Sequence, residues 1–151
     1  KEKIGWLKGS SVVNITASGR YGLRPLEASR GGRTAKIRLP GSPERYIYLE
    51  YRQPIGFDAN LASERYSANK NGLLLNYVKK SLNTYSNPVV DLTTTQLIDV
   101  SPATDDWYFG QPDFALHEAQ TLEINSGGQK ITIGPITQME PDLISFMVTI
   151  E

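Results

Sequence analysis

The stretch that decides the fold is RYIYLEYRQPIGFD, residues 45–58. In its first part, successive side chains are expected to face opposite sides of a β-strand. One face then carries Ile47, Leu49 and Tyr51, and the other carries Tyr46, Tyr48, Glu50 and Arg52. Large side chains on both faces are typical of a strand inside a sheet. Pro54 cannot donate a ladder hydrogen bond, and Gly56 permits a sharp turn, so the strand is predicted to end near Gln53.

Three charged residues of this stretch, Glu50, Arg52 and Asp58, have two interpretations. They form either a polar site with a chemical task or a structural clasp that closes the turn after the strand. We predict the clasp, in which Arg52 makes a bidentate pair with a carboxylate and locks the turn at residues 54–56.

Composition excludes several classes of protein. The 151 residues include 16 basic and 16 acidic side chains, so the chain has no broad field that attracts nucleic acid or an anionic membrane. There is no cysteine, which excludes disulfides, thiol catalysis and cysteine zinc sites. No apolar run approaches the roughly 20 residues that span a bilayer. We therefore expect neither a nucleic-acid partner nor a membrane span.

The rest of the chain is read as short alternating runs separated by turn residues. Residues 34–39 are predicted to form a hairpin with residues 45–51 through the turn at 40–43. Residues 122–124 and 131–133 flank a second hairpin loop, and residues 144–150 alternate as a full strand. About nine short strands with little helix predict an all-β fold, an antiparallel β-sandwich of the immunoglobulin-like or jelly-roll-like kind. We expect one domain over residues 1–151.

The sequence carries no recognisable catalytic motif. His117 is the only histidine, so a histidine-pair zinc helix cannot form. There is no G-x-S-x-G nucleophile elbow and no phosphate-binding glycine loop. A hydrolase that uses carboxylates and His117 stays formally open without a motif to support it. We predict that the chain is not an enzyme.

Residues 103–118 are acidic and aromatic, with the length of a functional loop. Asp105, Asp106 and Asp113 supply the oxygen ligands that calcium prefers, although the EF-hand spacing is absent. The alternative is an acidic loop anchored by its aromatic residues. Trp107 and Tyr108 are candidates to stack on a sugar or contact a protein, which makes a carbohydrate-binding module the alternative function.

The stretch at residues 45–58 also resembles a known family. It is similar to the region downstream of the catalytic domain in secreted zinc metallopeptidases of the gametolysin and immune-inhibitor-A type. The matching phrases include Y-x-Y-x-E-Y-R-x-P-I-G-F-D from Tyr46, N-G-L-L-L from Asn71, L-I-D-V-S-P from Leu97, Y-x-L-x-P-L-E from Tyr21, Lys36-Ile37 and Ile131-Thr132-Ile133. The resemblance spans about residues 4–150.

Those peptidases hold zinc with an H-E-x-x-H helix and a further histidine, and this chain has neither. The resemblance therefore implies a non-catalytic accessory domain, excised from a larger secreted protein and extracellular. It implies the upstream catalytic domain of the same polypeptide as a partner, together with an extracellular protein or glycan. Calcium is the one cofactor hypothesised, and no catalytic residue is carried over from the family.

Overall fold

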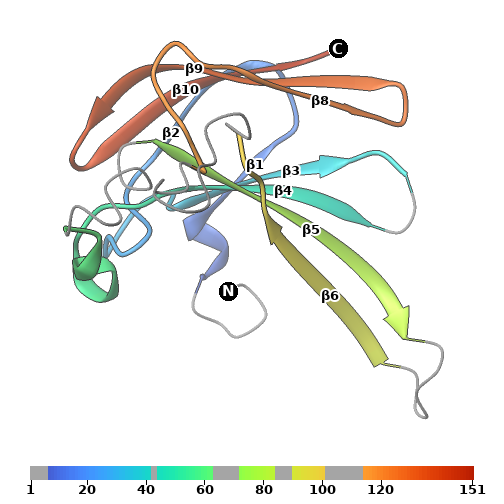
Figure 1. The fold of residues 1–151 in the computed structure, drawn as a ribbon, viewed down its shortest axis with the longest axis horizontal. Coiled ribbons are helices and arrows are strands. Elements are labelled where there is room, and N and C mark those ends of the chain that lie inside the picture. Colours follow the sequence, from blue (N-terminus) through green and yellow to red (C-terminus); the bar gives the residue numbers. More distant parts are fainter. Residues whose placement is uncertain (1–6, 42–43, 63–71, 84–89, 101–113) are drawn as a thin grey trace, which may run out of the picture.

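The computed structural model describes residues 7–41, 44–62, 72–83, 90–100 and 114–151, and these residues form an all-β fold of two sheets (Figure 1). The first sheet has the order β1 (Val12–Ile15), β3 (Thr34–Leu39), β4 (Arg45–Tyr51), β5 (Leu73–Asn83) and β6 (Val90–Leu97), with β7 (Ala115–Leu116) also paired to β5. The second has the order β2 (Gly19–Leu23), β10 (Leu143–Ile150), β9 (Gln129–Glu140) and β8 (Leu122–Ser126). Two short 3-10 helices, η1 (Gly9–Ser11) and η2 (Gly56–Ala62), complete the described elements.

Strand β4 lies in the middle of the first sheet, between β3 and β5. The predicted alternation is confirmed, because Ile47, Leu49 and Tyr51 are each at most 1% exposed. The predicted hairpin is confirmed as well: β3 and β4 pair in antiparallel register from Leu39 opposite Arg45 onward. A central strand with one fully buried face is the element around which both neighbours align.

The expectation of an entirely antiparallel fold is wrong at one pair of strands. β1 runs parallel to β3, with Val12 opposite Thr34 and Ile15 opposite Ile37. The intervening strand β2 does not pair with either, because it crosses to the second sheet and pairs with β10. The chain therefore returns to the first sheet in its original direction, which a two-residue hairpin could not do.

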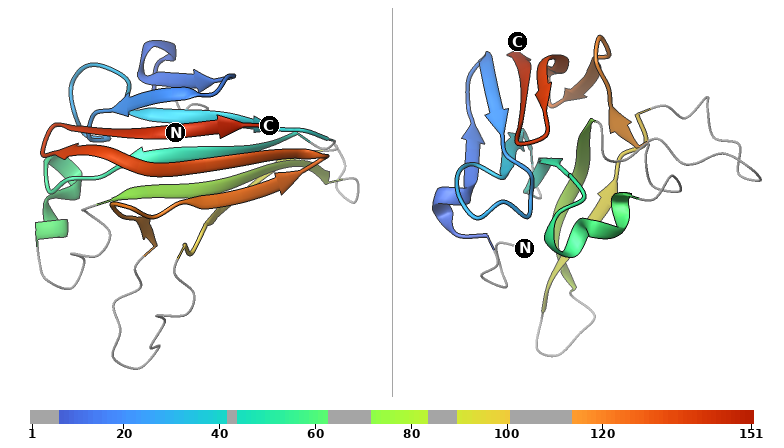
Figure 2. Two further views of the ribbon diagram at one scale, coloured as in Figure 1. Left: turned by 90° about the horizontal axis from the view of Figure 1, so that it is seen from above. Right: turned by 90° about the vertical axis from the view of Figure 1, so that its left-hand side faces the viewer.

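Buried side chains from both sheets belong to a single apolar cluster, and Figure 2 shows the strands of the two sheets from two further directions. The first sheet contributes fully buried residues such as Ile37 and Ile47, and the second contributes Ile133, Phe146 and Val148. Burial of a side chain of this size contributes about 1.5–3 kcal/mol each before entropy is counted. The alternation predicted for residues 144–150 is confirmed for Ile144, Phe146 and Val148, which are buried in the same apolar cluster as Ile47 and Leu49 of β4.

Strands β5 and β6 form a longer hairpin than the sequence indicates. Short separate strands are predicted near residues 73–78 and 89–92, but the ladder runs from Asn76 opposite Leu97 to Asn83 opposite Val90. The far part of this hairpin extends beyond the second sheet (Figure 1). Turn-forming residues such as Ser81 remain in the strand because the ladder to β6 satisfies their main-chain groups.

Candidate functional site

Three charged residues from the end of β4 to the start of η2, namely Glu50, Arg52 and Asp58, come together in one cluster. Arg52 Nη1 donates to Asp58 Oδ1 at 2.9 Å, and Nη2 donates to Glu50 Oε2 at 3.4 Å. The guanidinium therefore bridges two carboxylates, where the sequence predicted a bidentate pair with one. The side chains of Glu50 and Asp58 are only 6% and 12% exposed, so the cation compensates charge that water does not reach.

Gly56 gives the clasp its shape. Its φ of +56° is one that residues with a side chain rarely adopt. A Cβ built at this position would also lie 3.2 Å from Glu27 Oε2 and 3.3 Å from Glu27 Cβ. Both the backbone angle and the close approach of Glu27 therefore require glycine between the strand and η2.

The clasp holds two apolar side chains at the surface. Phe57 is 90% exposed and Ile55 is 42% exposed. They lie on either side of Gly56, between the two ends of the ion pair that joins Arg52 to Asp58. An exposed phenylalanine on a turn that a buried ion pair fixes is a pre-organised apolar contact. We call Ile55 and Phe57 the apolar corner.

Tyr51, the last residue of β4, joins the same end of the first sheet to the second. Its hydroxyl donates to the main-chain oxygen of Glu140 at 2.8 Å, although the ring is buried. Burial raises the pKa of the Tyr51 hydroxyl to about 12, and the charges of Asp142 and Glu140 add to the effect. The phenol is thus neutral at ordinary pH, and its proton is donated to the main chain of Glu140.

The other predicted site residues are not brought to this cluster. Asp105, Asp106 and Asp113, the calcium candidates, and Trp107 and Tyr108, the ligand candidates, all lie outside the described residues. Among residues that are described, no group of three or more histidine, aspartate or glutamate side chains is arranged to hold a metal ion.

The one histidine, His117, follows β7 in a turn. Its main-chain N–H donates to Gln120 Oε1 at 2.8 Å. Its Nδ1 lies 3.2 Å from a Cβ built at Gly72, so the imidazole packs closely against the chain that enters β5. The contacts that the structure gives His117 are those of a packed turn residue.

The tyrosines on the outer face of β4 have a cation over them. The rings of Tyr46 and Tyr48 are 6.3 Å apart and tilted by 58°. Lys36 Nζ lies 4.4 Å from the centre of the Tyr46 ring and 5.4 Å from that of Tyr48. A tilted pair with an ammonium group above it does not make the flat platform on which a sugar ring stacks.

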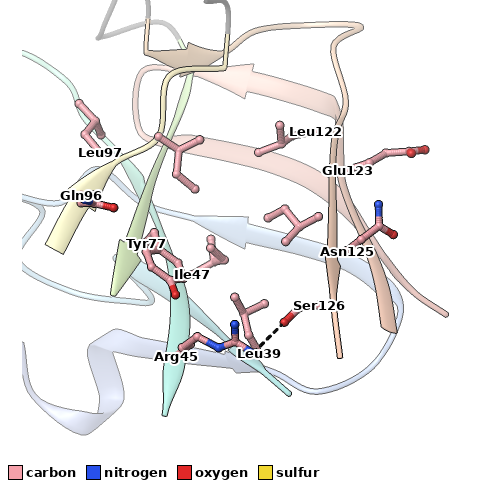
Figure 3. A pocket seen from close by; sticks show the side chains of 12 residues that line it. Leu39, Arg45, Ile47, Tyr77, Gln96, Leu97, Leu122, Glu123, Asn125 and Ser126 are labelled. Carbon is pink, nitrogen blue, oxygen red and sulfur yellow. Dashed lines mark hydrogen bonds between the residues drawn. The ribbon is translucent and has the colours of Figure 1, made fainter. Parts of the chain in front are cut away.

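The structure also shows a groove that sequence reasoning missed, between the ends of β5 and β6 and the edge strand β8 (Figure 3). We call it the β6–β8 groove. Its volume is about 600 Å³, and its apolar lining includes Ile47, Tyr77, Leu122 and Ile124. Arg45 lies at one end, where it donates to Ser126 Oγ at 3.3 Å. The groove could not be predicted because it joins strands of two different sheets.

Comparison with known proteins gives no relative: no protein-family model, curated protein or solved structure matches the chain. In the described part of the chain, no helix combines the length and the hydropathy needed to cross a membrane.

Proposed function

We propose that this chain is a β-sandwich domain of the immunoglobulin-like or jelly-roll-like kind that serves as a non-catalytic accessory domain of a secreted zinc metallopeptidase. It acts through protein contact, by packing on the catalytic domain that precedes it or by binding substrate or matrix. The sequence phrases of residues 46–58 support the choice of family. The shared core between the two sheets supports the sandwich.

The observation that carries the proposal is the apolar corner. A phenylalanine side chain that is 90% exposed contributes almost no apolar burial to the stability of the folded domain. Its exact placement nevertheless depends on a buried ion pair and on a glycine at φ +56°. Aromatic residues held rigidly in this way are typical contact hot spots, because little conformational entropy is lost when they bind.

The corner is a small exposed apolar surface made of two neighbouring side chains, which suits it to be one part of a larger contact between domains. Burial of one phenylalanine at an interface contributes about 1.5–3 kcal/mol. Interfaces between domains of one chain are of modest area and tolerate polar surroundings. The catalytic domain is accordingly the partner that we assign to the apolar corner, and an extracellular protein or glycan is the partner elsewhere on the domain.

Two experiments test this function. Reading the coding sequence upstream of Lys1 should reveal a peptidase domain with a zinc-binding helix; a different kind of domain would contradict the family. In the full polypeptide, Phe57→Asp should lower the midpoint of thermal unfolding of the peptidase domain and expose the interdomain segment to proteolysis.

A matched control is available in the same 3-10 helix. Ala59 is exposed, so Ala59→Asp adds the same charge without removing the phenyl ring. We expect Ala59→Asp to behave as the unmodified protein. Identical unfolding, secretion and substrate range for Phe57→Asp and Ala59→Asp would refute the assignment of the apolar corner.

A further inference from the structure

We propose that the β6–β8 groove binds an extended polypeptide segment, which adds to the edge strand β8 as an antiparallel strand and carries an acidic residue at its N-terminal end. This inference does not rest on the accessory role, because it concerns a different surface and needs no peptidase. Three properties of the groove support it: outward main-chain groups that pair with no strand among the described residues, an apolar lining, and a positively charged end.

The main-chain groups of β8 are directed alternately toward β9 and away from it. Ser126 and Gln129 flank the two-residue turn at Gly127 and Gly128, so they form a hydrogen-bonded pair and Asn125–Lys130 forms the wide pair. Lys130 confirms this alternation, because its N–H and C=O bond instead to Glu151 on the other side. The N–H and C=O of Asn125, and by the same period those of Glu123, therefore point out from the sheet edge.

No strand of the described part of the chain pairs with that outer edge of β8. Natural edge strands are usually protected by proline, lysine or a bulge. Residues 122–126 contain neither proline nor lysine. The one charged side chain among them, Glu123, forms an ion pair with Lys130 at 2.8 Å. The outward main-chain groups of β8 can therefore form hydrogen bonds with a further strand.

Side chains that alternate along an added strand would find an apolar surface on one face. Leu122 and Ile124 are partly buried against the apolar core, whereas the side chains of Glu123 and Asn125 point away from Leu122 (Figure 3). Opposite Leu122 and Ile124 lie two half-buried side chains, Tyr77 of β5 and Ile98, which follows β6. An added strand would place every second side chain against this surface, which gives specificity beyond the main-chain bonds.

Charge distinguishes the two ends of the groove. Arg45, which donates to Ser126 Oγ, lies directly opposite Lys79 in the β4–β5 ladder. Within the described residues, neither forms an ion pair with a carboxylate, and the two cations repel each other. A strand that runs antiparallel to β8 starts beside Ser126, so an acidic residue near its N-terminus would neutralise this end.

The test measures binding of two labelled peptides to the 151-residue chain by fluorescence anisotropy. Both peptides are acetylated and alternate threonine with valine; one begins with aspartate and the other with lysine. We expect saturable binding of the aspartate peptide below about 1 mM and at least threefold weaker binding of the lysine peptide. Lys79→Glu, a change at an exposed position, should reverse that preference, whereas Arg38→Glu on the opposite face of the same sheet should not.

A second pair of variants tests the edge itself. Asn125→Pro removes an outward N–H and leaves the ladder to β9 intact, so it should weaken binding about tenfold or more. Asn125→Thr keeps the donor and should bind within about twofold of the unmodified chain. The proposal is overturned if neither peptide binds saturably, if both bind equally, or if Asn125→Pro binds as tightly as Asn125→Thr. It is also overturned if sedimentation shows a dimer that Asn125→Pro abolishes, since a second copy would then occupy the edge.

Discussion

The clasp predicts a specific loss of stability when Arg52 is replaced. In Arg52→Leu, the carboxylates of Glu50 and Asp58 stay in an environment where they are 6% and 12% exposed, without their cation. Removing one partner of a buried ion pair costs about 3–5 kcal/mol. Because the Arg52 side chain is itself 28% exposed, we take the lower end, about 3 kcal/mol.

Arg52→Lys separates the role of geometry from that of charge. The ammonium group can approach one carboxylate, but it cannot bridge both with fixed N–H donors as the planar guanidinium does. We expect a loss of about 1–1.5 kcal/mol, the net contribution of one ordinary hydrogen bond, because the ammonium group keeps its contact with the other carboxylate. For a domain of this size, the two variants correspond to falls in Tm of about 6–12 °C and about 2–6 °C.

The assay is equilibrium unfolding in urea, with the slope of the transition checked for each variant. The matched control is Arg24→Leu, which breaks the Arg24–Asp142 pair at 3.1 Å, with side chains 48% and 74% exposed. A surface pair of this kind contributes about 0–1 kcal/mol. The reasoning is refuted if Arg52→Leu is no less stable than Arg24→Leu, or if adding Asp58→Asn to Arg52→Leu recovers none of the loss.

Two further predictions concern other parts of the same end of the fold. The pKa of Tyr51 is about 12 in the folded chain and 10.0 in the reference state, so its contribution to stability is complete below pH 10 and is lost as the pH rises toward 12. We expect the unmodified chain to lose about 2–3 kcal/mol of its free energy of unfolding over that interval, and Tyr51→Phe to show no such loss. At neutral pH, Tyr51→Phe should be about 1 kcal/mol less stable, because the hydrogen bond to Glu140 is removed. Parallel pH profiles of the two chains would contradict this. Gly72→Ala places a Cβ 2.6 Å from the main-chain oxygen of Leu116, so the pairing of β7 with β5 should weaken. The free energy of unfolding measured in urea should fall by about 1–3 kcal/mol, and the amide of Leu116 should exchange faster. Unchanged exchange at Leu116 would count against the contact.

Local patterns account for much of what was predicted correctly. Side chains of alternate residues in a strand face opposite sides, so the buried set Ile47, Leu49 and Tyr51 follows from the order of the residues alone. The same holds for the hairpin of β3 and β4, since turn residues lie at residues 40–43 between two alternating runs. Arg52 could be assigned to a carboxylate because guanidinium groups near strand ends are rarely left without a partner.

The parallel pairing of β1 with β3 and the length of the β5–β6 hairpin were not predictable in this way. Both depend on which strands meet across the sheet, and main-chain pairing can override the preference of individual residues such as Ser81 for turns. The burial of Glu50 was not predictable from the sequence either. A glutamate on the outer face of a sheet is usually exposed to solvent, but Glu50 is buried and pairs with Arg52.

Residue type and short-range period are enough to indicate an all-β chain, to predict the buried face of β4, and to show that the sequence carries no recognised catalytic motif. The contacts of Glu50, Arg52 and Asp58 follow only from the folded chain. The tertiary structure brought Asp58 back to Arg52, exposed Phe57 on the resulting turn, and left the outer edge of β8 beside the apolar face of β4 and β5. Such contacts join residues of different strands and sheets, and sequence spacing carries no information about the distances between them.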